Sequence, residues 1–69
     1  MYRLKYLRES ELLTQSEVAK AIFVAQRTYS YYETEEHDIP TKTLIRLADF
    51  YNVSVDYLLG RTENPKMNT

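Results

Sequence analysis

The sequence of 69 residues has no cysteine, no tryptophan, one glycine and two prolines. Because cysteine is absent, disulfide bonds and thiolate metal sites are excluded, and the composition fits the reducing cytoplasm. One glycine provides little material for the tight turns of β-hairpins, so helices are predicted instead of strands. No apolar run approaches the ~18 residues of a membrane span, and no signal-peptide pattern follows Met1, which predicts a protein that does not enter the membrane.

The sequence also lacks an excess of positive charge. Its net charge is −1 at pH 7, and its isoelectric point is about 5.7. Between residues 14 and 38, two basic side chains stand against five acidic ones, whereas each flank carries a small positive excess. Binders of nucleic acid usually have a basic surface, so the composition alone does not indicate such a partner. The apolar content of 43% is ordinary for a globular domain, and the length predicts a single one.

The most informative stretch runs from residue 14 to residue 33 and predicts two short helices joined by a tight turn. Thr14 and Glu17 have the spacing of a capping box, in which each side chain accepts a hydrogen bond from the other residue's backbone N–H. Val18, Ala19 and Ile22 then share one apolar face of the first helix.

The residues 23–25 interrupt this pattern, and a second helix follows. Ala25, Tyr29, Tyr32 and Glu33 share its inner face. The outer face is polar and carries Gln26, Arg27, Ser30, Tyr31 and Thr34. Gln can make two hydrogen bonds to adenine and Arg two to guanine, so this face has the chemistry of a helix that contacts base edges.

Three further helices complete an all-α prediction. The first covers residues 2–11, with Leu4 and Leu7 inward and Tyr6 half-buried. The fourth follows Pro40 with Thr41 as its N-cap and ends at Asn52 in a left-handed conformation. Its predicted inner face consists of Leu44, Ile45, Leu47, Ala48 and Tyr51.

A short fifth helix is capped by Ser54 and stopped by Gly60. Residues 1–60 then form the domain, and residues 61–69, which lack periodicity, form a flexible tail. The predicted common core consists of Leu7, Val18, Ala19, Ile22, Tyr29, Leu44, Leu47, Leu58 and Leu59.

No constellation of catalytic or metal-ligating residues is present in the sequence. There is no glycine-rich phosphate loop, and His37 is the only histidine, without a second ligand at a useful spacing. We therefore predict neither enzymatic activity nor a cofactor, and we interpret His37 as a solvated side chain.

Five motifs in this order resemble the Cro/Xre family of phage-repressor-like helix-turn-helix proteins. They are Leu4–Glu9, Thr14–Ala19, Tyr32-Glu33, Ile39-Pro40 and Val53–Gly60. The resemblance implies a compact five-helix, lambda-repressor-like DNA-binding domain with the helix-turn-helix at helices 2 and 3. It further implies a small repressor whose third helix enters the major groove of double-stranded DNA, usually as a homodimer on a palindromic site.

The resemblance also implies roles for individual residues. The expected base contacts are Gln26, Arg27, Ser30 and Tyr31, and the expected backbone contacts are Thr14, Gln15, Thr28 and Thr34. Arg8 and Glu33 correspond to an ion pair between helices 1 and 3 in the family. Tyr31 fits either a contact with DNA or a contact with another protein, because relatives often carry a polar or basic residue there.

Four departures from the family pattern keep a second hypothesis open. Phe23 replaces the usual turn glycine, Ala25 replaces a Ser or Thr N-cap, and Glu35 replaces a glycine. The connector to helix 4 is acidic where relatives are often basic. The alternative is a protein-interaction module, such as an antitoxin, which binds a basic protein partner through this acidic face. We favour DNA, because the positions that read bases in the family are polar here.

Overall fold

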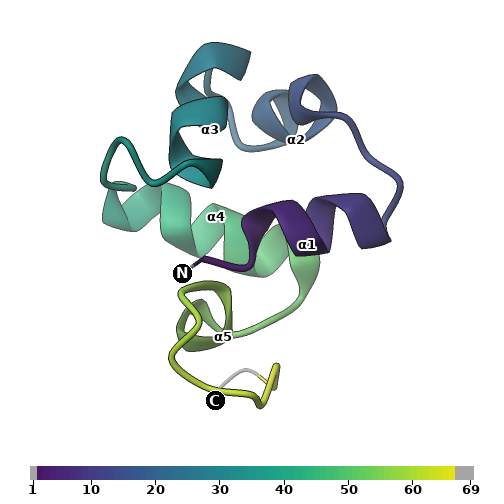
Figure 1. The fold of residues 1–69 in the computed structure, drawn as a ribbon, viewed down its shortest axis with the longest axis vertical. Helices are drawn as coiled ribbons and strands as arrows, with labels where there is room; N and C mark the ends of the chain where they lie inside the picture. The colour runs from purple at the N-terminus through teal and green to yellow at the C-terminus, as the bar shows by residue number, and fades with distance from the viewer. Residues whose placement is uncertain (1, 67–69) are drawn as a thin grey trace.

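The computed structural model describes residues 2–66. In this part of the chain five α-helices form one compact unit without β-strands, in agreement with the predicted fold class (Figure 1). The helices are α1 (Leu4–Ser10), α2 (Gln15–Ala21), α3 (Gln26–Glu33), α4 (Thr41–Tyr51) and α5 (Val55–Leu58). Helices α2 and α3 lie together at one end of the molecule, and α5 lies at the opposite end, with α1 and α4 between them (Figure 1). None of the helices within residues 2–66 is long and apolar enough to cross a membrane.

The start of α2 is set by the predicted capping box, which is confirmed. The backbone N–H of Glu17 donates to Thr14 Oγ1 at 3.1 Å, and the N–H of Thr14 donates to Glu17 Oε1 at 2.8 Å. Helix α3 begins directly after Ala25, which has extended backbone dihedrals but offers no capping side chain. Two helices thus begin where the sequence predicts, although only α2 has a side-chain cap.

The predicted N-cap of α4 is wrong by one residue. Pro40 occupies the N-cap position with extended backbone (φ −57°, ψ 148°), and its carbonyl accepts the first helical hydrogen bond from Leu44 N at 2.9 Å. Thr41 is therefore the first helical residue, and its hydroxyl does not cap the helix. Ser54, by contrast, caps α5 as predicted, since its Oγ accepts from the N–H of Tyr57 at 3.0 Å.

The core draws on all five helices and on three residues between them, Ile22, Ile39 and Val53. Its buried members are Leu4, Leu7, Val18, Ala19, Ile22, Tyr29, Tyr32, Ile39, Leu47, Ala48, Val53 and Leu58. Leu44 packs against this cluster while remaining partly exposed. Seven of the nine predicted core residues are buried here, and Leu59 is the one that the cluster does not include. Leu59 follows the four-residue α5 as its C-cap, so it lies beyond the helical face that Leu58 buries.

Two other burial predictions are wrong for a geometric reason. The side chain of Tyr6 is 63% exposed, because it lies two residues from Leu4 and so about 200° around a helix whose inner face carries Leu4 and Leu7. Ile45 is exposed for the same reason, two residues before the buried Leu47. Thr43, one turn before Leu47 on the inner face of α4, is buried instead of Ile45.

Each of the five helices is followed, one or two positions after its last residue, by a residue in the left-handed conformation. These residues are Leu12, Phe23, Glu35, Asn52 and Gly60, with φ between 56° and 77°. After each of them the next N–H bonds back to a carbonyl five residues earlier, as in Val24 N to Ala19 O at 3.0 Å. This is the Schellman motif, in which glycine is preferred because it has no Cβ. The chain has one glycine, so bulky side chains occupy strained positions, and Phe23 is 78% exposed there.

The segment that follows α5 returns towards the start of α1. The backbone N–H of Ser54 donates to Pro65 O at 2.9 Å, and Nη1 of Arg3, just before α1, donates to Thr62 O at 2.8 Å. Of the predicted flexible tail, residues 61–66 thus contact the domain in this structure, while residues 67–69 lie outside the described residues.

Candidate nucleic-acid interface

The outer face of α3 presents polar side chains at one end of the molecule. Gln26 and Arg27 occupy the first turn and are exposed, whereas Ser30 and Tyr31, one turn later, are partly buried. Helix α2 packs against the inner side of α3, where Ala19 and Tyr29 are buried. The Gln26 and Arg27 side chains are therefore carried on a supported helix rather than on a loop.

Tyr31 is less free than the sequence suggests. Its ring packs against the ring of His37 in the connector to α4, with ring centroids 4.7 Å apart. The two rings form part of a shallow groove of about 320 Å³, which Thr28, Tyr32, Asp38 and Pro40 also line. His37 was predicted to be a solvated side chain. It is exposed, but its ring also packs against the ring of Tyr31. Thr28 faces this groove from the first turn of α3.

Several side chains that the sequence predicts to contact the DNA backbone are already hydrogen-bonded within the chain. Thr14 Oγ1 is exposed but already accepts the capping hydrogen bond from Glu17 N. The hydroxyl of Thr34 bonds within its own helix end, with Tyr31 O at 3.2 Å and with Glu36 Oε1 at 2.9 Å. Gln15 Nε2 donates to Glu33 Oε1 at 3.1 Å. This last bond, which the sequence did not indicate, joins the first residue of α2 to the last residue of α3.

Arg8 and Glu33 form a two-point ion pair between α1 and the end of α3. Arg8 Nε donates to Glu33 Oε2 at 2.6 Å, and Nη2 donates to Oε1 at 3.3 Å. The remaining Nη1 donates to the carbonyl of Leu13 at 3.0 Å. The side chains are only 13% and 5% exposed, so this is a largely buried pair rather than a surface one. Arg8 is consequently not available to an external anion.

The ion pair controls the ionisation of its carboxylate. Burial by itself would raise the pKa of Glu33, but the hydrogen bonds from Arg8 and Gln15 hold this pKa below its usual value. The bond to Glu33 in turn raises the pKa of Arg8. Glu33 is therefore a fixed negative charge at neutral pH, and it orients Gln15 through that charge.

Two phenol groups lie buried beside this pair. The hydroxyl oxygens of Tyr29 and Tyr51 reach no hydrogen-bond partner among residues 2–66. Burial raises the pKa of both phenols, that of Tyr51 to about 12. Uncharged phenols tolerate such a site far better than phenolates, so both remain neutral at physiological pH.

Sequence reasoning missed three contacts that shape this surface, namely Gln15 to Glu33, Tyr31 to His37, and the attachment of the C-terminal segment to Arg3. None leaves a local signal, because each joins residues from separate elements. Within the described part of the chain, no group of three or more His, Cys, Asp or Glu side chains is placed to hold a metal ion.

The comparisons with known proteins agree with this geometry. A family model described as helix-turn-helix matches residues 4–58. The chain is 43% identical over 63 residues to the uncharacterized HTH-type transcriptional regulator YobD of Bacillus subtilis (strain 168), which covers 91% of this chain and 56% of the relative. It is 42% identical over 66 residues to the HTH-type transcriptional regulator ImmR of the same organism, which covers 96% of this chain and 52% of the relative.

A solved structure is similar over most of the chain. It is a transcriptional regulator from Listeria innocua, with a TM-score of 0.80 and 31% sequence identity over 88% of this chain and 57% of that one. The chain thus spans about half the length of the curated relatives and of the solved structure that it matches.

Proposed function

Because the chain belongs to the Cro/Xre-type helix-turn-helix family, we propose that it acts as the sequence-specific DNA-binding domain of a transcriptional regulator, most simply a repressor. In this proposal α3 enters the major groove of an operator. Residues 1–60 make up the proposed DNA-binding domain, and residues 61–69 follow it as a C-terminal segment. The domain has no catalytic activity of its own, needs no cofactor and works in the cytoplasm.

The observation that carries the proposal is the exposure of Gln26 and Arg27 at the start of a helix whose other face is buried. An α-helix with its side chains is about 10–12 Å in diameter, and the major groove is about 12 Å wide, so a helix such as α3 can enter it. Gln26 and Arg27 are proposed to contact bases, with Ser30 and Tyr31 one turn further. Thr14, Gln15, Thr28 and Thr34 are proposed to contact the DNA backbone.

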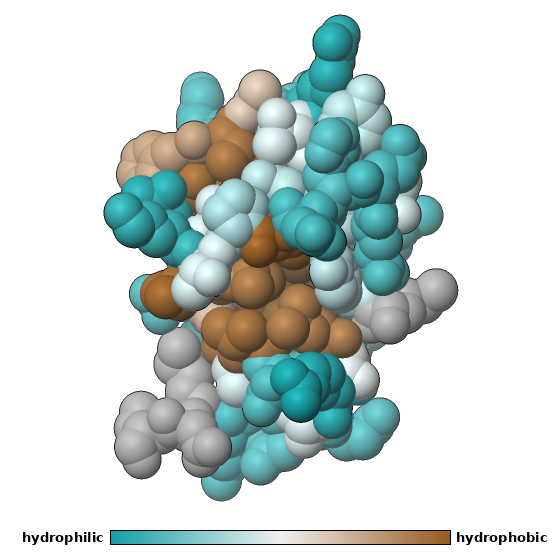
Figure 2. All heavy atoms as spheres, turned by 90° about the vertical axis from the view of Figure 1, so that its left-hand side faces the viewer, coloured by the Kyte–Doolittle hydropathy of each residue, from teal (hydrophilic) through white to brown (hydrophobic). Residues whose placement is uncertain are grey.

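A homodimer on a palindromic site is the proposed assembly. A helix of this length covers only a few base pairs, so two copies are needed for a site of useful specificity, with half-sites about 34 Å apart. Figure 2 shows a band of apolar surface on the face that carries the connector to α4, the start of α4 and α5. Such a surface supports association there. Light scattering that shows a monomer both free and on a palindromic duplex would rule this assembly out.

Few cationic side chains are available for phosphate contacts, and their number predicts how the affinity for DNA depends on salt. Arg8 is committed to Glu33, which leaves Lys5, Lys20, Arg27, Lys42 and Arg46 as the candidates. The logarithm of the affinity falls with the logarithm of salt concentration in proportion to the phosphates neutralised. We therefore expect a shallow salt dependence, with much of the affinity coming from neutral side chains and backbone N–H groups.

Selection from random duplex DNA tests the proposal directly, and an enriched palindrome is the expected result. On that sequence, Gln26→Ala should cost about 1–3 kcal/mol and relax discrimination at one base pair. Gln15→Ala should weaken binding to all sequences about equally, because a phosphate contact carries no sequence information. Asn64→Ala serves as the control, since this exposed residue follows α5, far along the chain from α2 and α3.

The competing function is a protein-interaction module that uses the acidic connector. Two of its acidic side chains already make bonds within the chain: Glu35 Oε2 accepts from Tyr2 N at 3.2 Å, and Glu36 Oε1 accepts from Thr34 Oγ1 at 2.9 Å. These bonds favour the DNA proposal over a dedicated acidic docking face. Two results together would favour the protein-interaction module over DNA binding. Gln15→Ala and Gln26→Ala would leave the affinity for DNA unchanged, and the double variant Glu35→Lys, Glu36→Lys would no longer bind a basic protein partner.

A further inference from the structure

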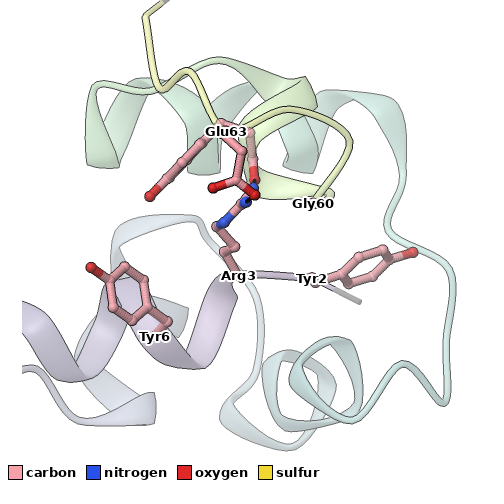
Figure 3. A pocket seen from close by; sticks show the side chains of 6 residues that line it. Tyr2, Arg3, Tyr6, Gly60 and Glu63 are labelled. Atoms are coloured by element: carbon pink, nitrogen blue, oxygen red, sulfur yellow. Dashed lines mark hydrogen bonds and ion pairs between the residues drawn. The ribbon is translucent and has the colours of Figure 1, made fainter.

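A hollow of the described surface lies where the start of α1 meets the segment after α5. It has a volume of about 580 Å³ and is lined by Tyr2, Arg3, Tyr6, Tyr57, Gly60 and Glu63. Figure 3 shows the Arg3 side chain between Tyr6 and Tyr2, with its guanidinium group directed towards Glu63. We propose that this groove is a binding site for a small aromatic carboxylate, and that the Glu63 side chain occupies the carboxylate position in the unliganded protein. The proposal is independent of the proposed DNA-binding function.

The guanidinium group of Arg3 is held rigidly with one edge left for a ligand. Its Nη1 donates to the carbonyls of Tyr57 at 2.6 Å and Thr62 at 2.8 Å, and the group lies 4.2 Å from the centroid of the Tyr57 ring. The Nε is not hydrogen-bonded to any residue in the range 2–66, and Nη2 bonds only to Glu63 there. The Nε and Nη2 edge of a guanidinium matches the two oxygens of a carboxylate. Arg3 is thus oriented before a ligand arrives.

Glu63 is a weak occupant of this edge. It meets Nη2 through one oxygen at 3.3 Å, which is long for a charge-assisted hydrogen bond. Its side chain is 99% exposed, whereas that of Arg3 is 21% exposed. An exposed partner held by one long contact contributes little stability and is easily displaced. A ligand carboxylate that bonds to both Nε and Nη2 replaces that contact with a better one.

The rest of the lining indicates the class of ligand. Three of the six lining residues are tyrosines, and Arg3 and Glu63 are the charged ones. Aromatic walls beside one cation favour a flat apolar body with a single negative charge. A phosphate dianion would find one guanidinium and an opposing carboxylate, which is a poor match. The nearby Glu35 is already bonded to the backbone of Tyr2.

The test uses the whole chain and benzoate as the probe. Titration of the ¹⁵N-labelled protein with sodium benzoate at low salt should give saturable shifts at Arg3, Tyr6 and Gly60, with a dissociation constant of about 1 mM, as befits a ligand of this size. Benzyl alcohol, which has the ring without the carboxylate, should bind at least tenfold more weakly. Equal binding of the two compounds, or benzoate shifts elsewhere on the surface, would overturn the proposal.

Two variants separate the carboxylate site from a general effect of charge. Glu63→Gln removes the internal competitor and should tighten benzoate binding about two- to fivefold, the range expected for an exposed ion pair. Glu11→Gln removes the same charge at the other end of α1 and should leave the dissociation constant unchanged. If both variants change it equally, the site is not the one proposed. Tyr6→Ala, at an exposed position that does not risk the fold, should weaken benzoate binding and leave the melting temperature unchanged.

Discussion

The guanidinium of Arg8 and the carboxylate of Glu33 join the first helix to the end of the third through two hydrogen bonds, at 2.6 Å and 3.3 Å. The same carboxylate accepts a bond from Gln15 at the start of α2. One buried negative charge therefore connects three helices, and it is bonded to Gln15, one of the proposed contacts with the DNA backbone. Its removal should affect the stability of the domain and the placement of Gln15 together.

The first prediction concerns this ion pair. Arg8→Ala leaves a buried carboxylate without its cation, so it should lower the free energy of unfolding by about 3 kcal/mol or more. A double-mutant cycle of Arg8→Ala with Glu33→Ala, measured by urea denaturation, should give a clear coupling energy. The surface pair of Arg61 and Asp56, 3.9 Å apart and 74% and 62% exposed, is the control. Arg61→Gln should cost less than about 1 kcal/mol. A cycle without coupling would contradict the role given to Glu33.

The second prediction concerns acid. The pKa of Glu33 lies below its ordinary value of 4.5, and the hydrogen bonds with Thr14 lower the pKa of Glu17 in the same way. Because these pKa values are lowered on folding, the folded state binds the two protons less tightly than the unfolded state does. The stability that the two carboxylates contribute is therefore complete above about pH 4.5 and is lost as the pH falls below it. Thermal melting should show this decline, and Glu33→Gln should have a shallower one. If the melting temperature of that variant falls with pH as steeply as that of the unaltered protein, the acid sensitivity arises from other groups.

The third prediction concerns alkali. Burial raises the pKa of Tyr51 from 10.0 to about 12, so the folded state keeps a proton that the unfolded state loses. The stability contribution is fully present below pH 10 and declines as the pH rises towards 12. Tyr51→Phe should remove this part of the decline, whereas Tyr6→Phe, at an exposed phenol, should not. Identical alkaline transitions in the two variants would show that the Tyr51 hydroxyl is solvated.

The fourth prediction concerns the turn between α2 and α3. Phe23 has φ 63°, a conformation that costs a residue with a side chain about 1 kcal/mol relative to glycine. Phe23→Gly should therefore raise the melting temperature by roughly 4–8 °C in a domain of this size. Gly60→Ala tests the reverse change at φ 77° and should destabilise by about 1 kcal/mol. Destabilisation by Phe23→Gly would mean that the contact between its ring and Arg46, 5.1 Å from the ring centroid, outweighs the strain.

The fifth prediction concerns the packing of α2 on α3. Ala19 is buried at this contact, so Ala19→Leu should overpack it and destabilise the domain by about 1–3 kcal/mol. Ala21→Leu, an exposed position of the same helix, is the control and should be nearly neutral. Equal melting temperatures for the two variants would show that the assumed register of α2 is wrong.

Much of the fold follows from local rules. The capping box of Thr14 and Glu17, the cap at Ser54 and the left-handed Asn52 involve neighbours in sequence, and all three agree with the structure. The predicted core is correct where apolar residues repeat at helical spacing. The predictions for Tyr6 and Ile45 are wrong because these residues were assigned to an inner helix face from which the helix geometry turns them away. The prediction for Thr41 is wrong by one position, because Pro40 is the N-cap of α4.

The sequence by itself determined the helix order, most of the core and the polar outer face of α3, because periodicity and capping act within a few residues of the chain. Only the tertiary structure decided that Gln15 is held by Glu33, that Tyr31 rests on His37, and that Arg3 fastens the segment after α5. These contacts depend on the distances at which packed helices bring remote polar groups together. Gln15 and Glu33 are 18 positions apart in the sequence, and Arg3 and Thr62 are 59 positions apart. No local pattern encodes such a distance, because it is set by the sum of all the packing contacts in the core.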